Sequence, residues 1–557
     1  MEHSVNQNPQ EMKKITISSL VTFILLTLSF NVFAQADIIQ HNGVPYQTPN
    51  SVMWGTDVII DNQPSENQRG PTLTVAFNGW VYAGFYVNSA AGSHWTVYRS
   101  TDDGATWSVF VHQSLNTNWY TSALDIVVTG SSEPTLRLFV ARVYQNDVAS
   151  LTEGKYTIYD GVAGSNLGTP WDDVQSSTSQ QFRDIKIVSD YRFPAVDASP
   201  YSIAVGYTKY QSSSDTVRVL TSSNGGTTID GNQLVVATGG YVRNLSLAYG
   251  RCANWFNGRY YVAWESRGST SYDLGAIYTS YSDNHFYDPF TTPVRLDNLM
   301  GSQTTDYARN PTISCQFNDI DNDMTNLTAI VLFDRAYNGS TTDYDIVGCY
   351  NKEGVSGTTW TPMYLDNVVN MAIQPHLNFD PAYNNFLLTY ANITDQKLRY
   401  LVMEQSLGDP NNWWVISDKY NENNNLVNPY PQVEINPVYT QTAHMWVGDI
   451  SGQGVATFDA EYSTIGIKEN PASMNLSVSP NPASTEVKFG LDIAKQSEVI
   501  LFLYNMQGKE VARMVNSSVA PGFKTFTMDV SSLAEGCYLY RISAGNNTGS
   551  GRLVVQK

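Results

Sequence analysis

Short runs of alternating apolar and polar residues fill most of the chain between residues 35 and 462, and polar turns separate them. Alternation with a period of two is typical of β-strands with one buried face. The runs follow one plan: an apolar strand, a short turn, a second apolar strand, a polar loop, a third strand, and a turn that ends in an aromatic residue. The pattern therefore predicts an all-β fold built from a repeat.

The turns after the third strands set the register of this repeat. Four of them align as "VYRSTDDGATW", "VLTSSNGGTTI", "IYTSYSDNHFY" and "GCYNKEGVSGTTW", and two looser relatives follow the same plan. Their closing residues lie 64, 58, 58, 73 and 53 residues apart and are Trp107, Trp171, Ile229, Tyr287, Trp360 and Trp413. A four-stranded unit of about 40–70 residues is typical of one β-propeller blade.

Both ends of the repeat region are incomplete, and the two incomplete parts fit together. An outer strand at 52–62 has no strand set before it, and the last set, 431–462, has no outer strand after it. Pairing the two removes free sheet edges, which are prone to aggregation. We therefore predict a seven-bladed propeller over 35–462 that is closed by the N-terminal strand. Six or eight blades stay open, because the divergent units are hard to count.

The first residues predict export. Lys13 and Lys14 precede an apolar run over 15–33, and a small-x-Ala pattern places cleavage after Ala34, with Ala36 as the second choice. This assigns 1–34 to a signal peptide, with Met12 as an alternative start. The other interpretation is a transmembrane anchor, which a cleavage pattern directly after the apolar run disfavours.

The last part of the chain reads as a separate small β-sandwich. A polar linker over 463–473 leads into alternating strands over 474–557. The sequences "SPNP", "LYNMQGKEV", "LAEGCYLYRI" and the terminal "GRLVVQK" resemble the type A C-terminal sorting domain of the type IX secretion system of Bacteroidetes. This resemblance implies recognition by the outer-membrane export machinery, followed by release or surface attachment. The alternative is an ordinary glycan-binding sandwich.

One turn carries a second resemblance. At every defined position it resembles the Asp box (BNR repeat) of sialidase-type propellers, and the matching residues are Ser100, Asp102, Gly104, Thr106 and Trp107. Asp and Ser side chains can bond nearby backbone amides, Gly can adopt positive φ, and Trp can fill the space between sheets. We therefore interpret the acidic pair Asp102–Asp103 as structural. In that family the box lies on the face opposite the active site.

Arginines recur where the first strand of a unit begins, often as Arg-x-Pro. Their side chains could converge near the propeller axis, where guanidinium groups would bind carboxylates. The predicted substrate-binding residues are Arg69, Arg192, Arg243, Arg309 and, on the same face, Arg335. The sequence "YRFP" around Arg192 also resembles the Phe/Tyr-Arg-Ile-Pro motif of sialidases, although it falls near the third blade rather than in the first. The alternative is a role in the fold, with ion pairs to Asp190, Asp306 or Glu66.

The predicted catalytic residues follow from the sialidase resemblance. Retaining sialidases use a Tyr nucleophile, which a carboxylate assists, and an Asp acid/base. Glu265 with Tyr191 or Tyr307 could form the first pair. Candidates for the proton donor are Asp190, Asp306 and Asp334. The alternative is that Glu265 forms an ordinary ion pair with a neighbouring arginine.

Charge and composition limit the remaining choices. A net charge of −19 and a pI near 4.7 exclude nucleic acid as a partner. The four cysteines are too few for a disulfide scaffold and are predicted to be buried thiols. No cofactor is required. Asp319, Asp321 and Asp323 occupy alternate positions and offer hard oxygen ligands, which predicts a calcium site. The alternative is a solvated loop.

The sequence thus predicts a secreted, sialidase-like, carbohydrate-active propeller that acts on an anionic glycan or polysaccharide at its central channel. If it is an enzyme, it is a glycoside hydrolase or another polysaccharide-degrading enzyme. The alternative is a non-catalytic surface propeller, similar to an adhesin, that binds glycans or proteins. We expect a monomer whose partners are the glycan and the type IX secretion machinery, and whose location is extracellular or on the outer-membrane surface.

Overall fold

The computed structural model divides into two compact units, one within the chain up to Tyr462 and one that comprises Ser463–Lys557 with two short segments, Val75–Gly79 and Ile435–Gln441. The structure describes residues 38–41, 44–47, 52–54, 57–61, 66–89, 92–176, 180–190, 201–211, 214–252, 258–268, 275–283, 288–300, 307–318, 328–336, 340–351, 359–366, 370–381, 385–404, 413–420, 425–436, 441–450, 452–463, 476–493, 496–505, 510–544 and 547–557. The predicted signal peptide, 1–34, lies outside these residues. No helix within the described ranges is long and apolar enough to cross a membrane.

Within the described residues, the first unit contains seven sheets, and the four main strands of each of the first six follow a single run of the chain. The short strand β22 (Phe317–Asn318) adds to the edge of the fourth sheet. The first three sheets are β5 (Gln68–Val75), β6 (Val81–Val87), β7 (His94–Ser100) and β8 (Ser108–Ser114); β9 (Trp119–Thr129), β10 (Arg137–Asn146), β11 (Leu151–Asp160) and β12 (Asn166–Gln175); and β13 (Gln180–Ser189), β14 (Ile203–Gln211), β15 (Ser214–Ser222) and β16 (Gly231–Thr238). The next three are β17 (Tyr241–Cys252), β18 (Arg259–Arg267), β19 (Ala276–Asp283) and β20 (Val294–Arg295); β21 (Tyr307–Cys315), β23 (Ala329–Ala336), β24 (Tyr344–Asn351) and β25 (Thr361–Asp366); and β26 (Ala372–Asp380), β27 (Asn385–Asn392), β28 (Lys397–Glu404) and β29 (Trp413–Tyr420).

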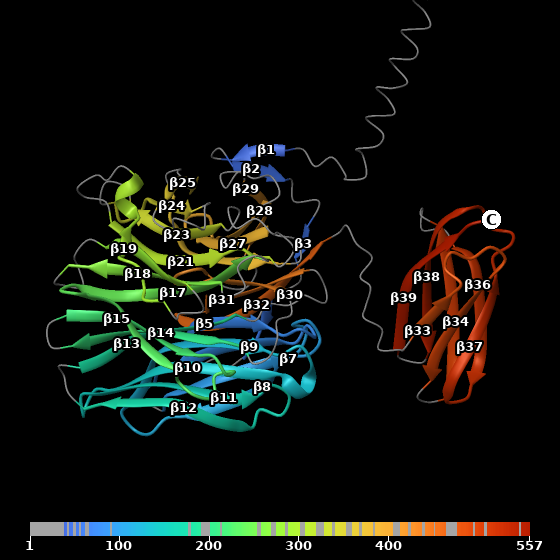
Figure 1. Ribbon diagram of the computed structural model, residues 1–557. Helices are drawn as coiled ribbons and strands as arrows, with labels where there is room; N and C mark the ends of the chain where they lie inside the picture. The colour runs from blue at the N-terminus through green and yellow to red at the C-terminus, as the bar shows by residue number, and fades with distance from the viewer. Residues whose placement is uncertain are drawn as a thin grey trace, which may run out of the picture. The chain divides into compact units, whose positions relative to one another are not determined.

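The seventh sheet combines the two ends of this unit. It contains β30 (Gln432–Asn436), β31 (Gln441–Ile450) and β32 (Gln453–Ser463), and the N-terminal strands β3 (Val52–Trp54) and β4 (Val58–Ile59) pair with β32. The sequence predicted this pairing. A hairpin of β1 (Ile38–His41) and β2 (Val44–Gln47) pairs with β29 at the edge of the sixth sheet. The sequence did not predict this addition. In Figure 1 the sheets follow the colour gradient from blue β5 to orange β32.

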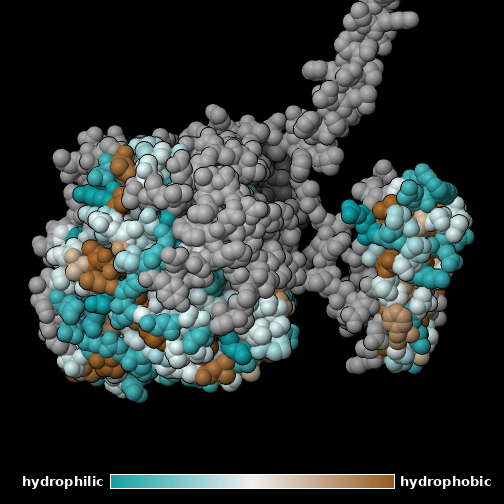
Figure 2. Space-filling view, viewed as in Figure 1, coloured by the Kyte–Doolittle hydropathy of each residue, from teal (hydrophilic) through white to brown (hydrophobic). Residues whose placement is uncertain are grey.

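The strand pattern reflects how the sheets pack. Second strands such as β23 are buried along their whole length, whereas fourth strands such as β12 are mostly exposed or half-buried. Strands that are covered on both faces read as continuous apolar runs, because every side chain meets a neighbouring sheet. One apolar cluster accordingly includes residues from the third to the sixth sheet, and another joins the second and third sheets. Figure 2 shows brown apolar side chains only in separate patches on the described part of the visible face.

A repeated hydrogen bond links each first strand to the next one. In each case a side chain accepts a bond from a backbone N–H of the following sheet, over distances of 2.8–3.3 Å. The acceptor–donor pairs are Thr72–Ile126, Asp125–Ile187, Asp184–Leu245, Ser246–Ile313, Thr312–Leu377 and His376–Val433. Gln68 Oε1 accepts from the Ala456 N–H at 2.6 Å and so joins the seventh sheet to the first. These bonds satisfy backbone donors that face a neighbouring sheet.

The turn after β7 is held by its own side chains. Asp102 accepts from the Ser100 hydroxyl at 2.8 Å and from the backbone and hydroxyl of Thr106 at 2.8 and 2.6 Å, while the Ser100 hydroxyl accepts from the Gly104 N–H. Gly104 has φ +84°, and Trp107 packs edge-on against Phe458. The turn after β15 repeats these bonds with Ser222, Asn224, Gly226 and Thr228. Because Ser100 pairs with Val81 at the start of β6, the first turn lies at the end of its sheet away from Arg69.

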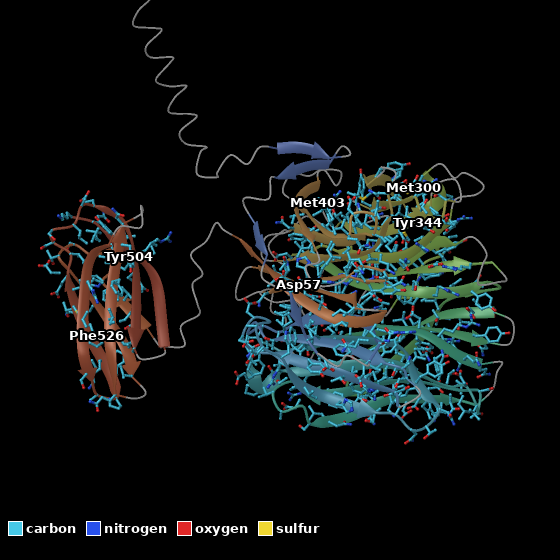
Figure 3. The ribbon with its side chains drawn as sticks, turned by 180° about the vertical axis from the view of Figure 1, so that it is seen from behind. Asp57, Met300, Tyr344, Met403, Tyr504 and Phe526 are labelled. Carbon is cyan, nitrogen blue, oxygen red and sulfur yellow. The ribbon has the colours of Figure 1, made fainter. Side chains whose placement is uncertain are left out.

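The second unit is a β-sandwich. One sheet contains β33 (Leu476–Ser479), β34 (Glu486–Ile493) and β37 (Gly522–Asp529), and the other contains β36 (Glu510–Val519), β35 (Ser497–Asn505), β38 (Gly536–Ala544) and β39 (Asn547–Val555). Both sheets contribute to one apolar core, which includes Phe489, Leu501 and Ile542. Phe526, on β37, also belongs to it and is labelled in Figure 3.

Candidate functional site

Five first strands have a residue with a left-handed backbone near their start, four within the first four residues of the strand and one just before it. Four of these residues precede a proline, and the ladder register shifts at Asn244, Asn310 and Gln374. The φ values are 58° at Gly70, 52° at Asn244, 51° at Asn310, 56° at Gln374 and 43° at Tyr430. Such bulges redirect the neighbouring side chains. The recurring Arg-x-Pro sequence therefore has a local structural basis, because its middle residue adopts this conformation.

The third sheet differs from the predicted register. Its first strand is β13, which ends before Arg192, so the strand set does not begin at that arginine. The register shifts between Phe182 and Asp184 and gives Arg183 a bulge position comparable to those of the other arginines, without a following proline. The sequence "YRFP" led the prediction to place the start of this strand set at Arg192, after the strand that actually begins it. Arg183 forms an ion pair with Asp215 at 3.3 Å.

Two carboxylates lie where the second strands β18 and β23 face these bulges. Glu265 is the ladder partner of Arg243, and Asp334 is the ladder partner of Arg309. Both carboxylate side chains are fully buried. Glu265 forms an ion pair with Arg267, as one sequence interpretation predicted, and Asp334 pairs with the Arg309 Nε at 3.3 Å.

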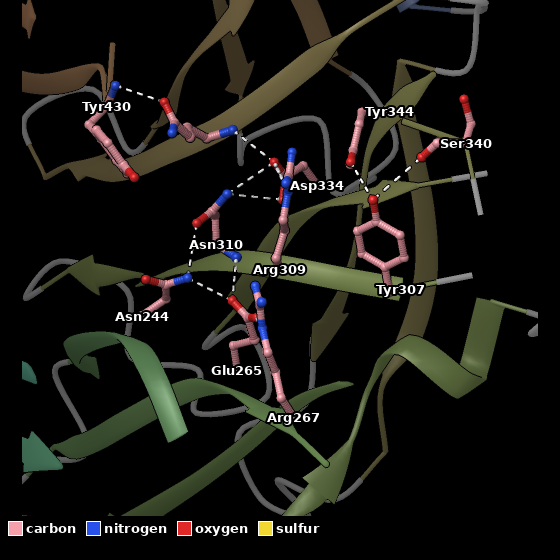
Figure 4. A network of polar contacts seen from close by, with 11 residues as sticks. Asn244, Glu265, Arg267, Tyr307, Arg309, Asn310, Asp334, Ser340, Tyr344 and Tyr430 are labelled. Atoms are coloured by element: carbon pink, nitrogen blue, oxygen red, sulfur yellow. Dashed lines mark hydrogen bonds and ion pairs between the residues drawn. The ribbon is translucent and has the colours of Figure 1, made fainter. Parts of the chain in front are cut away.

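Amide side chains from the bulges connect the two carboxylates (Figure 4). Asn244 Nδ2 donates to Glu265 Oε2 at 2.6 Å and to Asn310 Oδ1 at 3.0 Å. Asn310 donates its backbone N–H to Glu265 at 3.4 Å and its Nδ2 to Asp334 at 3.1 Å. The resulting network, which we call the central network, joins the fourth and fifth sheets.

The central network continues into the sixth and seventh sheets. The Gln374 N–H donates to Asp334 at 3.4 Å, and the Gln374 Oε1 accepts from the Tyr430 N–H at 2.9 Å. Four successive sheets thus meet through residues at the same end of their first strands. This arrangement requires the bulges, since a regular strand would place these side chains in the ladder.

Asp334 has an unusual acidity. Burial raises its pKa to about 7, and the Glu265 carboxylate adds to the increase, although Arg309 and the bonds from Asn310 and Gln374 oppose it. A buried carboxyl group with a pKa near neutrality can hold or release a proton under physiological conditions. Strongly shifted groups of this kind occur frequently at functional sites.

Two arginines of this region remain available. Arg69 is exposed and Arg243 is half-buried, and neither forms an ion pair with any residue that the structure describes. Burial lowers the pKa of Arg243 and the positive charge of Arg267 lowers it further, while the Glu265 carboxylate opposes the shift. Burial raises the pKa of Tyr86 to about 12, and Tyr430 raises it further while the Arg69 charge opposes the shift.

The other predicted site residues fall elsewhere. Asp190 accepts from the Ser202 N–H at 2.8 Å at the far end of β13, and Arg335 is buried, with its guanidinium donating to the Met300 carbonyl. The Tyr307 hydroxyl bonds the Tyr344 hydroxyl, beside the central network. The remaining candidates lie outside the described residues and are Tyr191, Arg192, Asp306, Asp319, Asp321 and Asp323. Across the described ranges, no group of three His, Cys, Asp or Glu side chains could hold a metal ion.

The sequence did not predict the four residues that link the charges of the central network, Asn244, Asn310, Gln374 and Tyr430. It also did not predict a role for Arg183 at the bulge of the third sheet. The first four occupy the position of the x in Arg-x-Pro, and that position was the available signal. The prediction used the arginine and the proline of this motif and left out the residue between them.

Comparison with known proteins identifies one part of the chain. Residues 477–556 match the family described as "Secretion system C-terminal sorting domain". The second unit is a secretion sorting domain. This match confirms the predicted type IX sorting domain and supports export, followed by secretion or attachment to the cell surface. No curated protein matches the chain significantly.

Solved structures resemble the larger unit only distantly. A protein of unknown function from Dyadobacter fermentans is 11% identical, with 74% of this chain and 100% of that chain covered and a TM-score of 0.40. An α-L-arabinofuranosidase from Fusarium graminearum, in complex with an iminosugar inhibitor, is 8% identical, with 74% and 98% covered and a TM-score of 0.40. The polysaccharide lyase Uly1 is 11% identical, with 77% and 95% covered and a TM-score of 0.41. Scores at this level assign neither a fold nor an activity, and the sialidase resemblance stays a prediction.

Proposed function

We propose that this chain is an exported, carbohydrate-active protein whose first unit is a seven-bladed propeller that binds an anionic glycan at the central network. Seven successive sheets and the bond from Gln68 to the seventh sheet support the ring. The sorting domain supports delivery to the cell exterior, where polysaccharides are accessible. Its partner during export would be the type IX secretion machinery.

The observation that carries this proposal is that Arg69 and Arg243 form no ion pair with any residue that the structure describes. The chain has a net charge of −19, yet these two arginines at the starts of the first and fourth sheets remain without an ion pair among the described residues. A guanidinium group can bind a carboxylate or sulfate through two parallel hydrogen bonds. The site therefore suits a sugar that carries a negative charge, such as a uronate or a sialic acid.

Glu265 and Asp334 act in this proposal as positioning residues. Their side chains are fully buried and their oxygens already accept bonds from Asn244, Asn310 and Gln374. They would hold the arginines and amides in place for the ligand. A non-catalytic binding protein therefore needs fewer functional groups beyond those described here than an enzyme would, and it is the first version of this proposal.

A glycoside hydrolase or polysaccharide-degrading enzyme of sialidase-like type is the second candidate. The pKa of Asp334, raised to about 7 chiefly by burial, favours it, because a general acid works best with a pKa near the operating pH. The earlier candidates Tyr191, Arg192 and Asp306 belong to this version of the proposal. Neither version needs a cofactor, and a calcium ion at Asp319–Asp323 would be structural.

Binding to defined oligosaccharides tests the proposal. The purified protein would be titrated with oligogalacturonate, sialyllactose and neutral lactose. We expect Arg243→Met to weaken binding of the charged sugars about tenfold or more, because a charged hydrogen-bond pair of about 1.4 kcal/mol or greater is lost. Arg295→Met is the matched control, since Arg295 is exposed on β20 and pairs with Asp297 at 2.8 Å.

Two results would contradict the proposal: no binding of any anionic sugar, or equal affinities in the wild type and Arg243→Met. Release of reducing ends or of unsaturated uronates from the same sugars separates the two versions. Turnover by the wild type that Asp334→Asn abolishes, with ligand affinity retained, would favour the enzyme.

A further inference from the structure

Tyr430 has a backbone conformation that its residue type disfavours. Its φ is +43°, and it is the sole aromatic residue with positive φ among the residues that the structure describes. The corresponding positions of other sheets carry Gly70, Asn244, Asn310 and Gln374. A bulky residue in this region is strained, and such strain occurs mainly at binding and active sites, where the surroundings hold it.

The surroundings of Tyr430 hold its backbone and leave its ring accessible. Its N–H donates to Gln374 Oε1 at 2.9 Å, and Pro431 follows it at the start of the seventh sheet. The side chain is 45% exposed. Figure 4 shows its phenol turned toward the Asn310 side of the central network.

Charged groups of the network surround the phenol. Asp334, Arg309, Glu265 and Arg243 are all close enough to affect its pKa, which burial raises first and the carboxylates raise further. The phenol is therefore neutral at physiological pH. A neutral phenol can donate a hydrogen bond and stack through its ring, but it is a poor nucleophile.

Tyr86, on β6, lies directly against Gly70 in the first sheet. It depends on Gly70, because a Cβ at that position would lie 2.3 Å from the Tyr86 Cε1. Arg69, the neighbour of Gly70, influences the same tyrosine. Tyr86 is thus held, half-buried, against the backbone next to Arg69, whereas Tyr430 is the more exposed of the two tyrosines.

We propose that Tyr430 is an aromatic platform on which a sugar ring of the anionic ligand stacks, at the edge of the central network. A glycan ring offers a C–H face, and aromatic rings bind such apolar faces. The platform selects an anion that is attached to a sugar over a small inorganic anion. This inference rests on the proposed function and assigns Tyr430 as its specificity-determining residue.

Three variants of the full-length protein test the platform. Tyr430→Asn introduces the residue found at the corresponding positions 244 and 310, Tyr430→Phe keeps the ring, and Tyr364→Asn is the control. Tyr364 is a tyrosine of similar exposure, 51%, on the outer strand β25. Calorimetry with oligogalacturonate and with inorganic sulfate gives the affinities, and thermal unfolding gives Tm.

We expect Tyr430→Asn to weaken oligogalacturonate binding about tenfold, as for the loss of one stacked ring. Its Tm should equal or exceed that of the wild type, because the strain is relieved. Any binding of sulfate should be unchanged. Tyr430→Phe should keep the affinity within about threefold, and Tyr364→Asn should have no effect on affinity.

The outcomes separate this inference from the function on which it rests. If the wild type binds the uronate and Tyr430→Asn binds it equally well, the platform is wrong and the proposed function stands. If the wild type binds no anionic sugar, the proposed function fails first. If Tyr430→Asn unfolds, Tyr430→Phe decides, since a tenfold loss of affinity in a stable Phe variant would overturn stacking.

Discussion

The turn at Ser100–Trp107 and the central network both depend on hydrogen-bonded aspartates, but in opposite ways. Asp102 is exposed, and its partners Ser100 and Thr106 lie within four residues. Its limited burial would raise the pKa, but the bonds from Thr106 and Ser100 outweigh this and lower it. The turn therefore holds an ionised carboxylate with groups of its own loop.

Asp334 is buried, takes its partners from two sheets and feels the charge of a third. Arg309 and Asn310 belong to the preceding strand of its own sheet, Gln374 to the next sheet, and Glu265 of the previous sheet repels its charge. Burial dominates, and its pKa rises to about 7. The same residue type thus closes a local turn in one place and joins several sheets in the other.

The largest difference between the two aspartates should appear on truncation. Asp334→Ala removes the buried partner of half-buried Arg309 and of the Asn310 amide, which should cost about 3–5 kcal/mol of unfolding free energy. Urea denaturation measures this loss. Asp334→Asn should cost much less, because it keeps an acceptor and the shape of the side chain. A loss below about 1 kcal/mol in the Ala variant would show that the network does not hold these sheets together.

The two aspartates should also respond to pH with opposite signs. The pKa of Asp334 is about 7 in the folded protein and about 3.9 in the unfolded chain, so the folded state binds the extra proton between these values. Asp334 therefore decreases stability as the pH rises from about 4 to 7, by up to about 4 kcal/mol. The pKa of Asp102 is lowered, so its contribution is present above about pH 4 and is lost as the pH falls further.

Comparison of the wild type with Asp334→Asn isolates this effect. The difference in unfolding free energy between the two proteins should shift in favour of the variant as the pH rises from 5 to 8. Parallel pH profiles for both proteins would mean that Asp334 titrates as an ordinary carboxyl group.

The smallest effect should come from the local turn. Asp102→Ala removes three hydrogen bonds of an exposed side chain and should cost about 1–2 kcal/mol, while glycan binding stays unchanged. Asp102→Asn should cost less, since Asn224 already accepts the same backbone bond in the second copy of the turn. Denaturation and sugar titration of both variants check this. A loss of glycan affinity would mean that the turn and the central network are coupled.

The sequence by itself determined the features that depend on near neighbours. The repeat, the strand alternation, the bonds around Asp102 and the sorting domain all follow from residues close together in the chain. The pairing of the N-terminal strands with β32 was also predictable, because each end of the repeat lacked what the other supplied. Burial and turn chemistry act over a few residues and leave a visible pattern.

Only the tertiary structure decided which polar residues meet. The gathering of Asn244, Asn310, Gln374 and Tyr430 depends on bulges in strands about 60 residues apart, and nothing local marks these four as neighbours. The full burial of Asp334 likewise follows from the adjacent sheets rather than from its own strand. Electrostatics and strain at a site are set by distance in space, and for this protein the fold alone fixes those distances.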